Sequence, residues 1–399
     1  MGIPITRPII GDEEITAVSE TLRSGWVTQG PQVAQFEQDF AAYVGAEHAC
    51  AVSNCTTALH LALLAVGVKP GDEVITVSHS FIATANSVRY CGAIPVFVDI
   101  QPDTFNIDPL LIETVINERT SAILCVHQMG MPCDMDAILA IAQKHNLPVV
   151  EDAACAIGSE ILFQGKWEKI GKPHGDIACF SFHPRKVITT GDGGMITTTN
   201  PEWDKQFRLW RQHGMSVPDT VRHESRKIVF ESYDALGYNY RMTDIQASVG
   251  REQLKRLPEI IERRRLLAYK YRELLDDIPD LELPHEPSWA RSNWQSFCVR
   301  LPEHIEQQDV MQSMLDADVS TRRGIMCSHL EPAYQREPWS CGDAACACRN
   351  NSGSCAQLVQ SEQAQNKTII LPLFPQMSVE DQECVAVALA KACMNGSTK

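Results

Sequence analysis

"SAILCVHQMGMPCDMDAILAIAQKHNLPVVEDA", residues 121–153, contains a complete strand–helix–strand unit. Apolar runs at 121–127 and 147–153 flank a segment, 134–146, whose apolar residues recur at spacings of three and four. Such spacing predicts an amphipathic helix, and short apolar runs without alternation predict strands buried on both faces. We therefore predict two parallel strands joined by a helical crossover.

Similar units recur through the first 200 residues, with further strands predicted at 48–54, 72–78, 94–100 and 176–182. Their alternation with helices predicts an α/β fold, with a mostly parallel sheet flanked by helices, in a large domain of residues 1–250. A long charged helical segment, 243–276, with a break expected at Pro258, leads into a smaller C-terminal α+β domain of residues 251–399. Two strands (295–301 and 367–375) and a closing helix (379–394) are expected there.

The charge balance excludes one class of partner. The 399 residues include 50 acidic and 35 basic side chains, a net charge of −15, which disfavours nucleic-acid binding. The sequence has neither an apolar stretch of membrane-spanning length nor a signal-peptide core, so we expect no membrane partner and a cytoplasmic location.

Ligands of parallel sheets bind beyond the carboxyl ends of the strands. The residues expected at this edge are 53–57, 78–81, His127, Asp152 and the region of Ser181.

Asp152 and Lys186 form the most informative pair at this edge. Each has an ordinary interpretation, because Asp152 could cap a helix and Lys186 could be a solvated turn lysine. Together they are the two groups that pyridoxal phosphate (PLP) chemistry requires. A buried carboxylate keeps the pyridine nitrogen protonated, and an amine with a pKa lowered by desolvation and a nearby cation forms a Schiff base with the aldehyde.

The phosphate of such a cofactor needs hydrogen-bond donors. Thr56 and Thr57 begin a predicted helix, whose backbone N–H groups and dipole suit an anion, and Ser181 could donate from the opposite side. A plain helix cap is the alternative for "SNCTT". Phe81 follows a strand end and either stacks on the pyridine or belongs to the core. The sequence has neither a Walker A motif nor an early G-x-G-x-x-G, which removes the main support for a P-loop NTPase or a dinucleotide-dependent dehydrogenase.

Six segments occur in an order that resembles a known family: "SNCTTALHLAL", "VHQMGMPCDMDAI", "VVEDAACAIGSE", "CFSFHPRKVITTGDGGM", "LGYNYRMTDIQASVGREQL" and "IILPLFPQMS". From about residue 5 to 390 the chain closely resembles the DegT-type sugar aminotransferases, PLP enzymes of the aspartate-aminotransferase fold (fold type I). The resemblance implies a Schiff base on Lys186 and a contact from Asp152 to the pyridine nitrogen. It also implies phosphate contacts and ring stacking by Thr56, Thr57, Ser181 and Phe81.

The resemblance extends to the neighbouring subunit and to the substrate. Asn239 would reach the phosphate of the neighbouring subunit's cofactor, which implies a homodimer with shared active sites. His183 would border the sugar, and Arg241 would lie nearby without a firm role. Cys155 departs from the family, which usually has Gln or His there to bind the cofactor's 3-oxygen, and a thiol is a weaker donor.

The implied reaction moves an amino group from an amino acid, usually L-glutamate, to a keto-sugar carried on a nucleotide. A cyclic ketone such as an inosose is an alternative acceptor, and a non-catalytic regulator on the same fold is the alternative from another class. The retained Lys186 argues against the related sugar 3-dehydratases, in which histidine replaces it. Arg322 and Arg323 either bind the nucleotide's diphosphate or face solvent.

A Cys-rich loop, 337–358, contains Cys341, Cys346, Cys348 and Cys355. Four cysteines within 15 residues could bind a structural zinc ion, but the spacing C-x4-C-x-C-x6-C matches no common zinc motif. A loop of free thiols is the alternative. Transamination with PLP needs no metal, so no metal ligand is assigned from the sequence.

Overall fold

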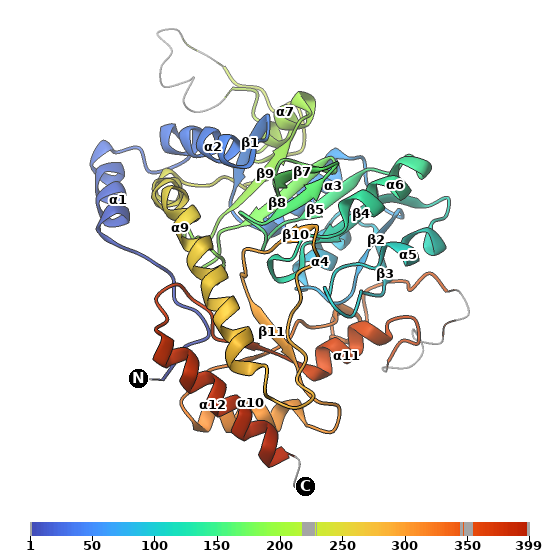
Figure 1. The fold of residues 1–399 in the computed structure, drawn as a ribbon. Helices are drawn as coiled ribbons and strands as arrows, with labels where there is room; N and C mark the ends of the chain where they lie inside the picture. The colour runs from blue at the N-terminus through green and yellow to red at the C-terminus, as the bar shows by residue number, and fades with distance from the viewer. Residues whose placement is uncertain (1, 218–227, 229, 344–345, 347–353, 397–399) are drawn as a thin grey trace.

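A computed structural model describes residues 2–217, 228, 230–343, 346 and 354–396 (Figure 1). A seven-stranded sheet with the order β1-β9-β8-β5-β4-β2-β3 forms its centre. These strands are β1 (His48–Val52), β2 (Glu73–Val77), β3 (Ile94–Val98), β4 (Thr120–Val126), β5 (Val149–Asp152), β8 (Ile177–Ser181) and β9 (Gly194–Thr198). The helices are α1 (Asp12–Ser24), α2 (Pro31–Val44), α3 (Cys55–Ala65), α4 (Ala83–Tyr90), α5 (Pro109–Ile112), α6 (Met135–His145), α7 (Pro201–Trp210), α9 (Asp244–Leu275), α10 (Gln307–Asp316), α11 (Val359–Lys367) and α12 (Val379–Gly396).

The central sheet is mostly parallel, as predicted. β9 alone among its seven strands runs antiparallel, pairing with β8 on one side and β1 on the other. The other six therefore end at the same edge, which brings the predicted site segments together. A second sheet, β10-β6-β7, is not foreseen by the sequence analysis; β6 and β7 lie in the connection between β5 and β8, and β10 follows α9. Its strands are β6 (Glu160–Phe163), β7 (Lys166–Lys169) and β10 (Ala290–Arg291).

Both faces of the central sheet are covered by helices, which explains why most residues of its strands are apolar. Side chains from α2, α6 and the first half of α9 pack with alternate strand residues such as Ile123 and Ala178. The intervening residues, such as Leu124 and Cys179, pack on the opposite face with α3, α4 and α7. The two cores therefore follow the alternation of side chains along each strand.

A buried ion-pair network joins α2, β1 and the end of α7. Glu37 accepts hydrogen bonds from Arg208 at 2.6 Å, from Arg211 at 2.5 Å and from the backbone N–H of Ala51 at 2.9 Å. Burial alone would raise the pKa of Glu37, but the guanidinium groups of Arg211 and Arg208 outweigh it and hold the pKa below its ordinary value. The carboxylate is therefore ionised and fully paired at neutral pH.

α9 connects the central sheet to the smaller C-terminal part, as its course in Figure 1 shows. The expected break at Pro258 is wrong: the helix is continuous from 244 to 275. Pro258 cannot donate to the carbonyl four residues earlier, but buried side chains on both sides of it, including Leu257 and Ile260, hold the helix in the core.

The smaller part contains the sheet β11-β13-β12, with α10 and α12 packed together beside it. Its strands are β11 (Phe297–Arg300), β12 (Arg322–Arg323) and β13 (Thr368–Leu371). The division expected at residue 250 falls inside α9. Ile261 still packs with the central core whereas Leu267 packs with the second core, so we propose that the division lies between these two residues.

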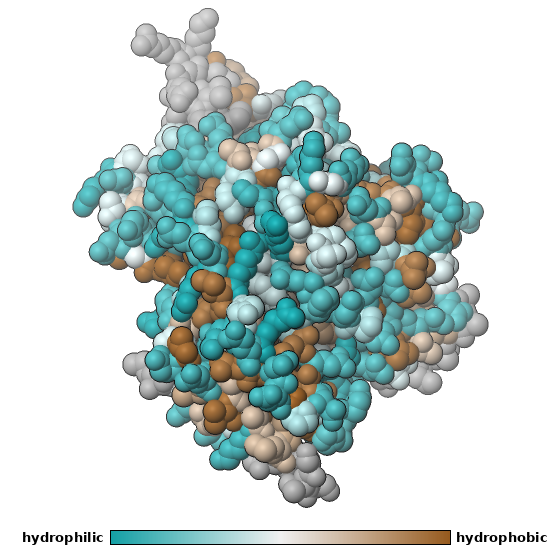
Figure 2. All heavy atoms as spheres, viewed as in Figure 1, coloured by the Kyte–Doolittle hydropathy of each residue, from teal (hydrophilic) through white to brown (hydrophobic). Residues whose placement is uncertain are grey.

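The visible face in Figure 2 is mainly hydrophilic, with hydrophobic residues in small separate groups. Within the described residues, no helix is both long and apolar enough to span a bilayer.

Candidate active site

Lys186 lies in the turn that follows β8, where its backbone N–H donates to the carbonyl of His183 at 2.8 Å. Its side chain is half-buried, and Nζ donates to Sγ of Cys155 at 3.0 Å. Burial alone would lower the pKa of Lys186, but the neighbouring Cys155 and the carboxylate of Asp152 outweigh it and raise the pKa. The expectation of a lowered pKa is therefore wrong here, because a carboxylate and a thiol rather than a cation lie beside the amine.

Asp152 occupies the last position of β5 and is buried. One carboxylate oxygen, Oδ2, accepts from the hydroxyl of Thr84 at 2.8 Å, and the other, Oδ1, accepts from the backbone N–H of Ala154 at 3.2 Å. Burial raises the pKa of this carboxyl, and the Thr84 hydrogen bond opposes the rise. A partner cation, such as a protonated ring nitrogen, would remove the cost of the buried charge. Thr84 has no motif of its own, so sequence reasoning missed it.

The beginning of α3 forms a donor site. Asn54 caps the helix: its side-chain oxygen accepts from the N–H of Thr57 at 2.9 Å, so this amide is already used. Within the described part of the chain, the N–H groups of Cys55 and Thr56 make no hydrogen bond. The expected cap is thus present, and Cys55 and Thr56 rather than Thr57 supply the open amides that an anion could use.

Strand β9 brings Ser181 close to this donor site. Gly194 of β9 pairs with Ser181 on one side and with Val52 of β1 on the other. A Cβ at Gly194 would lie 2.5 Å from the carbonyl carbon of Asn54, so only glycine permits this close approach. The hydroxyl oxygen of Ser181 lies 3.4 Å from the backbone nitrogen of His183, a weak contact that leaves it able to donate elsewhere.

Phe81 and His183 lie in the segments around these residues. Phe81 is 62% exposed, so it is not a core residue, and its ring is accessible to a ligand. His183 accepts at Nδ1 from the backbone N–H of Arg185 at 3.2 Å. Burial and the cations of Arg185 and Lys186 lower the pKa of His183. The imidazole is therefore neutral, with its proton on Nε2, and can donate one hydrogen bond there.

The other residues predicted for the site, Asn239, Arg241, Arg322 and Arg323, are less closely associated with the residues around Lys186 and Asp152. Asn239 is exposed and Arg241 is half-buried, and the backbone of Arg241 pairs with Val52 beside the donor site. Arg322 and Arg323 are consecutive residues of β12, so their side chains point to opposite faces. Arg323 is already paired with a carboxylate 3.0 Å away. The two arginines therefore do not form a common fork.

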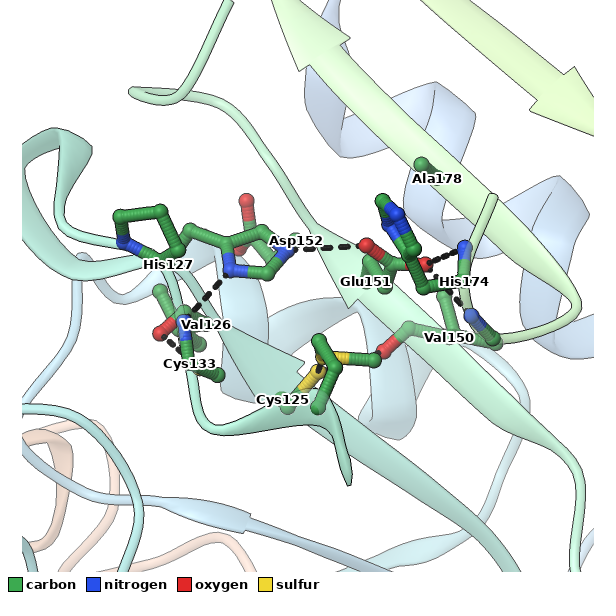
Figure 3. Close-up of polar contacts among 12 residues, drawn as sticks. Cys125, Val126, His127, Cys133, Val150, Glu151, Asp152, His174 and Ala178 are labelled. Atoms are coloured by element: carbon green, nitrogen blue, oxygen red, sulfur yellow. Dashed lines mark hydrogen bonds and ion pairs between the residues drawn. The ribbon is translucent and has the colours of Figure 1, made fainter. Parts of the chain in front are cut away.

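Figure 3 shows a second buried carboxylate, that of Glu151, hydrogen-bonded to His127 and to the backbone N–H of His174. Glu151 precedes Asp152 on β5 and so faces the other side of the sheet, where Oε2 accepts from Nε2 of His127 at 3.0 Å. The backbone N–H of Cys133 donates to Nδ1 of the same ring at 3.0 Å, which places the imidazole proton on Nε2. The N–H groups of residues 174–175 donate to Oε1 at 2.8 and 2.7 Å. His127 is thus part of a buried hydrogen-bond network with Glu151, on the face of the sheet opposite the Asp152 side chain.

Comparisons with known proteins agree with this geometry. Residues 8–390 match the DegT/DnrJ/EryC1/StrS aminotransferase family. The chain belongs to this family. It is therefore an aminotransferase, and the fold predicted from the resemblance is confirmed.

Among its relatives, the spore coat polysaccharide biosynthesis protein SpsC of Bacillus subtilis is 39% identical over 97% of this chain and 96% of SpsC. Spr1654 of Streptococcus pneumoniae, in its PMP form, is 27% identical, with a TM-score of 0.88 and coverage of 99% and 100% of the two chains. It has also been solved in a PLP form. Helicobacter pylori PseC, an aminotransferase involved in the biosynthesis of pseudoaminic acid, is 26% identical, with a TM-score of 0.87 and coverage of 99% and 100%. The two forms of Spr1654 indicate dependence on pyridoxal phosphate.

Proposed function

We propose that this aminotransferase transfers the amino group of L-glutamate to a keto-sugar linked to a nucleotide, with PLP bound between α3, β5 and β8. The position of the Lys186 amine carries the proposal: it lies 3.0 Å from Sγ of Cys155 and close enough to the buried carboxylate of Asp152 for that charge to raise its pKa. The relatives support a sugar acceptor, since SpsC is named for polysaccharide biosynthesis and PseC for an amino sugar acid.

When bound, PLP supplies the electron sink that stabilises negative charge at the carbon losing its proton. The open N–H groups of Cys55 and Thr56, with the hydroxyl of Ser181, bind the phosphate. Asp152 holds the proton on the pyridine nitrogen, and Phe81 covers one face of the ring. With the phosphate and the ring nitrogen held by these residues, the Lys186 amine would be available for proton transfer.

Lys186 is the proton carrier. Its Nζ takes the proton from the α-carbon of the amino-acid donor and returns it on the cofactor side, acting first as a base and then as an acid. The raised pKa of Lys186 keeps the amine protonated before cofactor binding. A ring cation paired with Asp152 offsets the carboxylate's charge, so cofactor binding itself lowers the pKa of the amine.

The proposal includes a homodimer with shared sites. Asn239 is exposed, and Ile228, Phe230, Tyr233 and Leu236 before it are between 63% and 90% exposed. Such an apolar run next to a site is typical of a surface covered by another chain. We propose that it packs on a second subunit and that Asn239 donates to the phosphate there.

One experiment tests the chemistry. The PLP-loaded protein is reduced with borohydride, digested and analysed by mass spectrometry, and the visible spectrum is recorded before and after L-glutamate. We expect the cofactor mass on Lys186 in the wild type and in Lys205→Ala, an exposed control, and on no lysine in Lys186→Ala. Glutamate should bleach the yellow band.

Modification of a different lysine, or a band that L-glutamate leaves unchanged, would contradict the assigned base or donor. The acceptor is tested by adding keto compounds to the aminated enzyme. Recovery of the band with a free cyclic ketone but not with a nucleotide-linked keto-sugar would overturn that part of the proposal.

A further inference from the structure

The Cys-rich loop forms a compact cluster of sulfur atoms outside the active site. The Sγ atoms of Cys341, Cys346 and Cys355 all lie within 4.8 Å of one another, and those of Cys346 and Cys355 are 3.8 Å apart. A disulfide bond would need about 2.05 Å. Tetrahedral zinc with Zn–S bonds of about 2.3 Å places neighbouring sulfurs roughly 3.8 Å apart. The separation thus matches two thiolates on one metal ion rather than a disulfide.

We propose that Cys341, Cys346 and Cys355 bind a structural zinc ion. Three thiolates form a soft ligand set, which favours Zn²⁺ over the hard cations Mg²⁺ and Ca²⁺. Cys341 and Cys355 are buried, and they pack in an apolar cluster with Phe97 and Trp339 that keeps water from most of the site. Cys348, the fourth cysteine of this stretch, lies outside the described residues.

The cysteine cluster lies in a segment whose two ends are hydrogen-bonded to the edge strand β3 and to Asp99, the residue that follows it. Before it, the N–H of Ser340 donates to the carbonyl of Pro95, and the N–H of Phe97 donates to the carbonyl of Ser340. After it, the backbone N–H and hydroxyl of Ser361 both donate to Asp99, at 2.8 and 2.6 Å. A metal between these anchors would cross-link the intervening loop, which has little regular structure of its own in the described residues.

A short chain of hydrogen bonds leads from the cluster to the active site. The backbone N–H of Cys355 donates to Glu362, and Oε1 of Glu362 lies 3.1 Å from Nε2 of His329. Nδ1 of His329 lies 2.6 Å from the hydroxyl of Ser78, at the end of β2 and three residues before Phe81. Zinc at the cluster would therefore stabilise the backbone that presents Phe81, without contacting substrate or cofactor.

The test compares metal content and thermal stability. The wild type, Cys346→Ser and Cys384→Ser are purified without chelators, and zinc is measured by plasma mass spectrometry. Cys346 is the half-buried ligand and its replacement disturbs packing least, while Cys384 is exposed on α12 and serves as the control. We expect about one zinc per chain in the wild type and in Cys384→Ser, and less than one-tenth of that in Cys346→Ser.

A second measurement does not depend on a variant. X-ray absorption at the zinc edge should show at least three sulfur neighbours at about 2.3 Å, and removal of the metal with a chelator should lower the melting temperature. Protein that neither retains zinc nor takes it up on titration, wild-type zinc content in Cys346→Ser, or a Cys346–Cys355 disulfide in protein kept anaerobic would each overturn the proposal. The PLP spectrum is recorded separately, so failure of the zinc site and failure of the transaminase chemistry are distinguishable.

Discussion

The hydroxyl of Thr84 should control the charge on Asp152. The two side chains are buried and joined by a 2.8 Å hydrogen bond, and the remaining contact to the carboxylate comes from a backbone N–H at 3.2 Å. Thr84→Val removes the hydroxyl and keeps the shape of the side chain. The ionised carboxylate loses its shorter and better donor, whereas the protonated carboxyl loses much less.

A hydrogen bond to a charged group contributes about 1.5–3 kcal/mol. Each 1.36 kcal/mol is a factor of ten in rate, so the half-reaction should slow by about 10- to 150-fold if the ionised Asp152 is needed in the transition state. Burial already raises the pKa of Asp152, and loss of the donor raises it further. The folded state then keeps a proton that the unfolded chain has released, so the unfolding free energy falls as pH rises between the unfolded and folded pKa values. In the variant this fall extends to higher pH.

The rate is measured by stopped-flow mixing of the PLP-loaded enzyme with L-glutamate, and stability by urea unfolding across a pH series. Thr84→Ser restores the hydroxyl and should recover both properties. Ser87→Ala removes a neighbouring hydroxyl that donates only to the Thr84 carbonyl at 2.8 Å, and it should leave the rate unchanged. A wild-type rate in Thr84→Val, or an equal loss in Ser87→Ala, would refute the assigned role.

Two further predictions concern buried charge. Glu37→Gln leaves the buried Arg211 without a carboxylate, whereas Arg208 keeps Asp204 at 2.8 Å, and it should cost about 3–5 kcal/mol in urea unfolding at neutral pH. Because the pKa of Glu37 is lowered, this loss of unfolding free energy should shrink as pH falls through that pKa. The exposed control Glu202→Gln should cost less than about 1 kcal/mol. A similarly small cost for Glu37→Gln would contradict the reasoning. Cys155→Ala removes the group whose interaction most strongly raises the pKa of Lys186, so the pH midpoint for the rate of PLP uptake should move down; a midpoint that stays unchanged or rises would contradict this role of Cys155.

The sequence predicts the central fold well because its strands are buried on both faces. Apolar runs such as 121–127 lack alternation, and the crossovers between several of them have clear helical spacing. The sequence predicts the course of the chain around Pro258 poorly. Whether a proline breaks a helix depends on the packing of its neighbours, and here both sides are buried in the core.

The site is predicted in part, and the limit is distance along the chain. Lys186 and Asp152 carry recognisable chemistry in themselves, whereas Thr84 becomes important only because the fold places it beside a residue 68 positions away. At the helix start, residues 54–57, one backbone amide is used by the cap while its neighbours remain open as donors. The residue types alone do not specify which amides are used and which are open. Arg322 and Arg323 are separated by strand geometry rather than by anything visible in their spacing.

The buried pair of Glu151 and His127 also bears on how the central strand finds its place during folding. Apart from Glu151 and Asp152, β5 and its neighbours are largely apolar on both faces, so hydrophobicity alone scarcely distinguishes the native alignment from one displaced by a residue. Such a displacement would turn Glu151 towards the cofactor side, send Asp152 into the opposite core, and leave a buried imidazole without its acceptor. The cost of an unpaired buried charge, several kcal/mol, makes that misaligned sheet a poor competitor. Pairing of Glu151 with His127 thereby favours the native register of β5. In that register Asp152, the next residue, faces the cofactor side of the sheet.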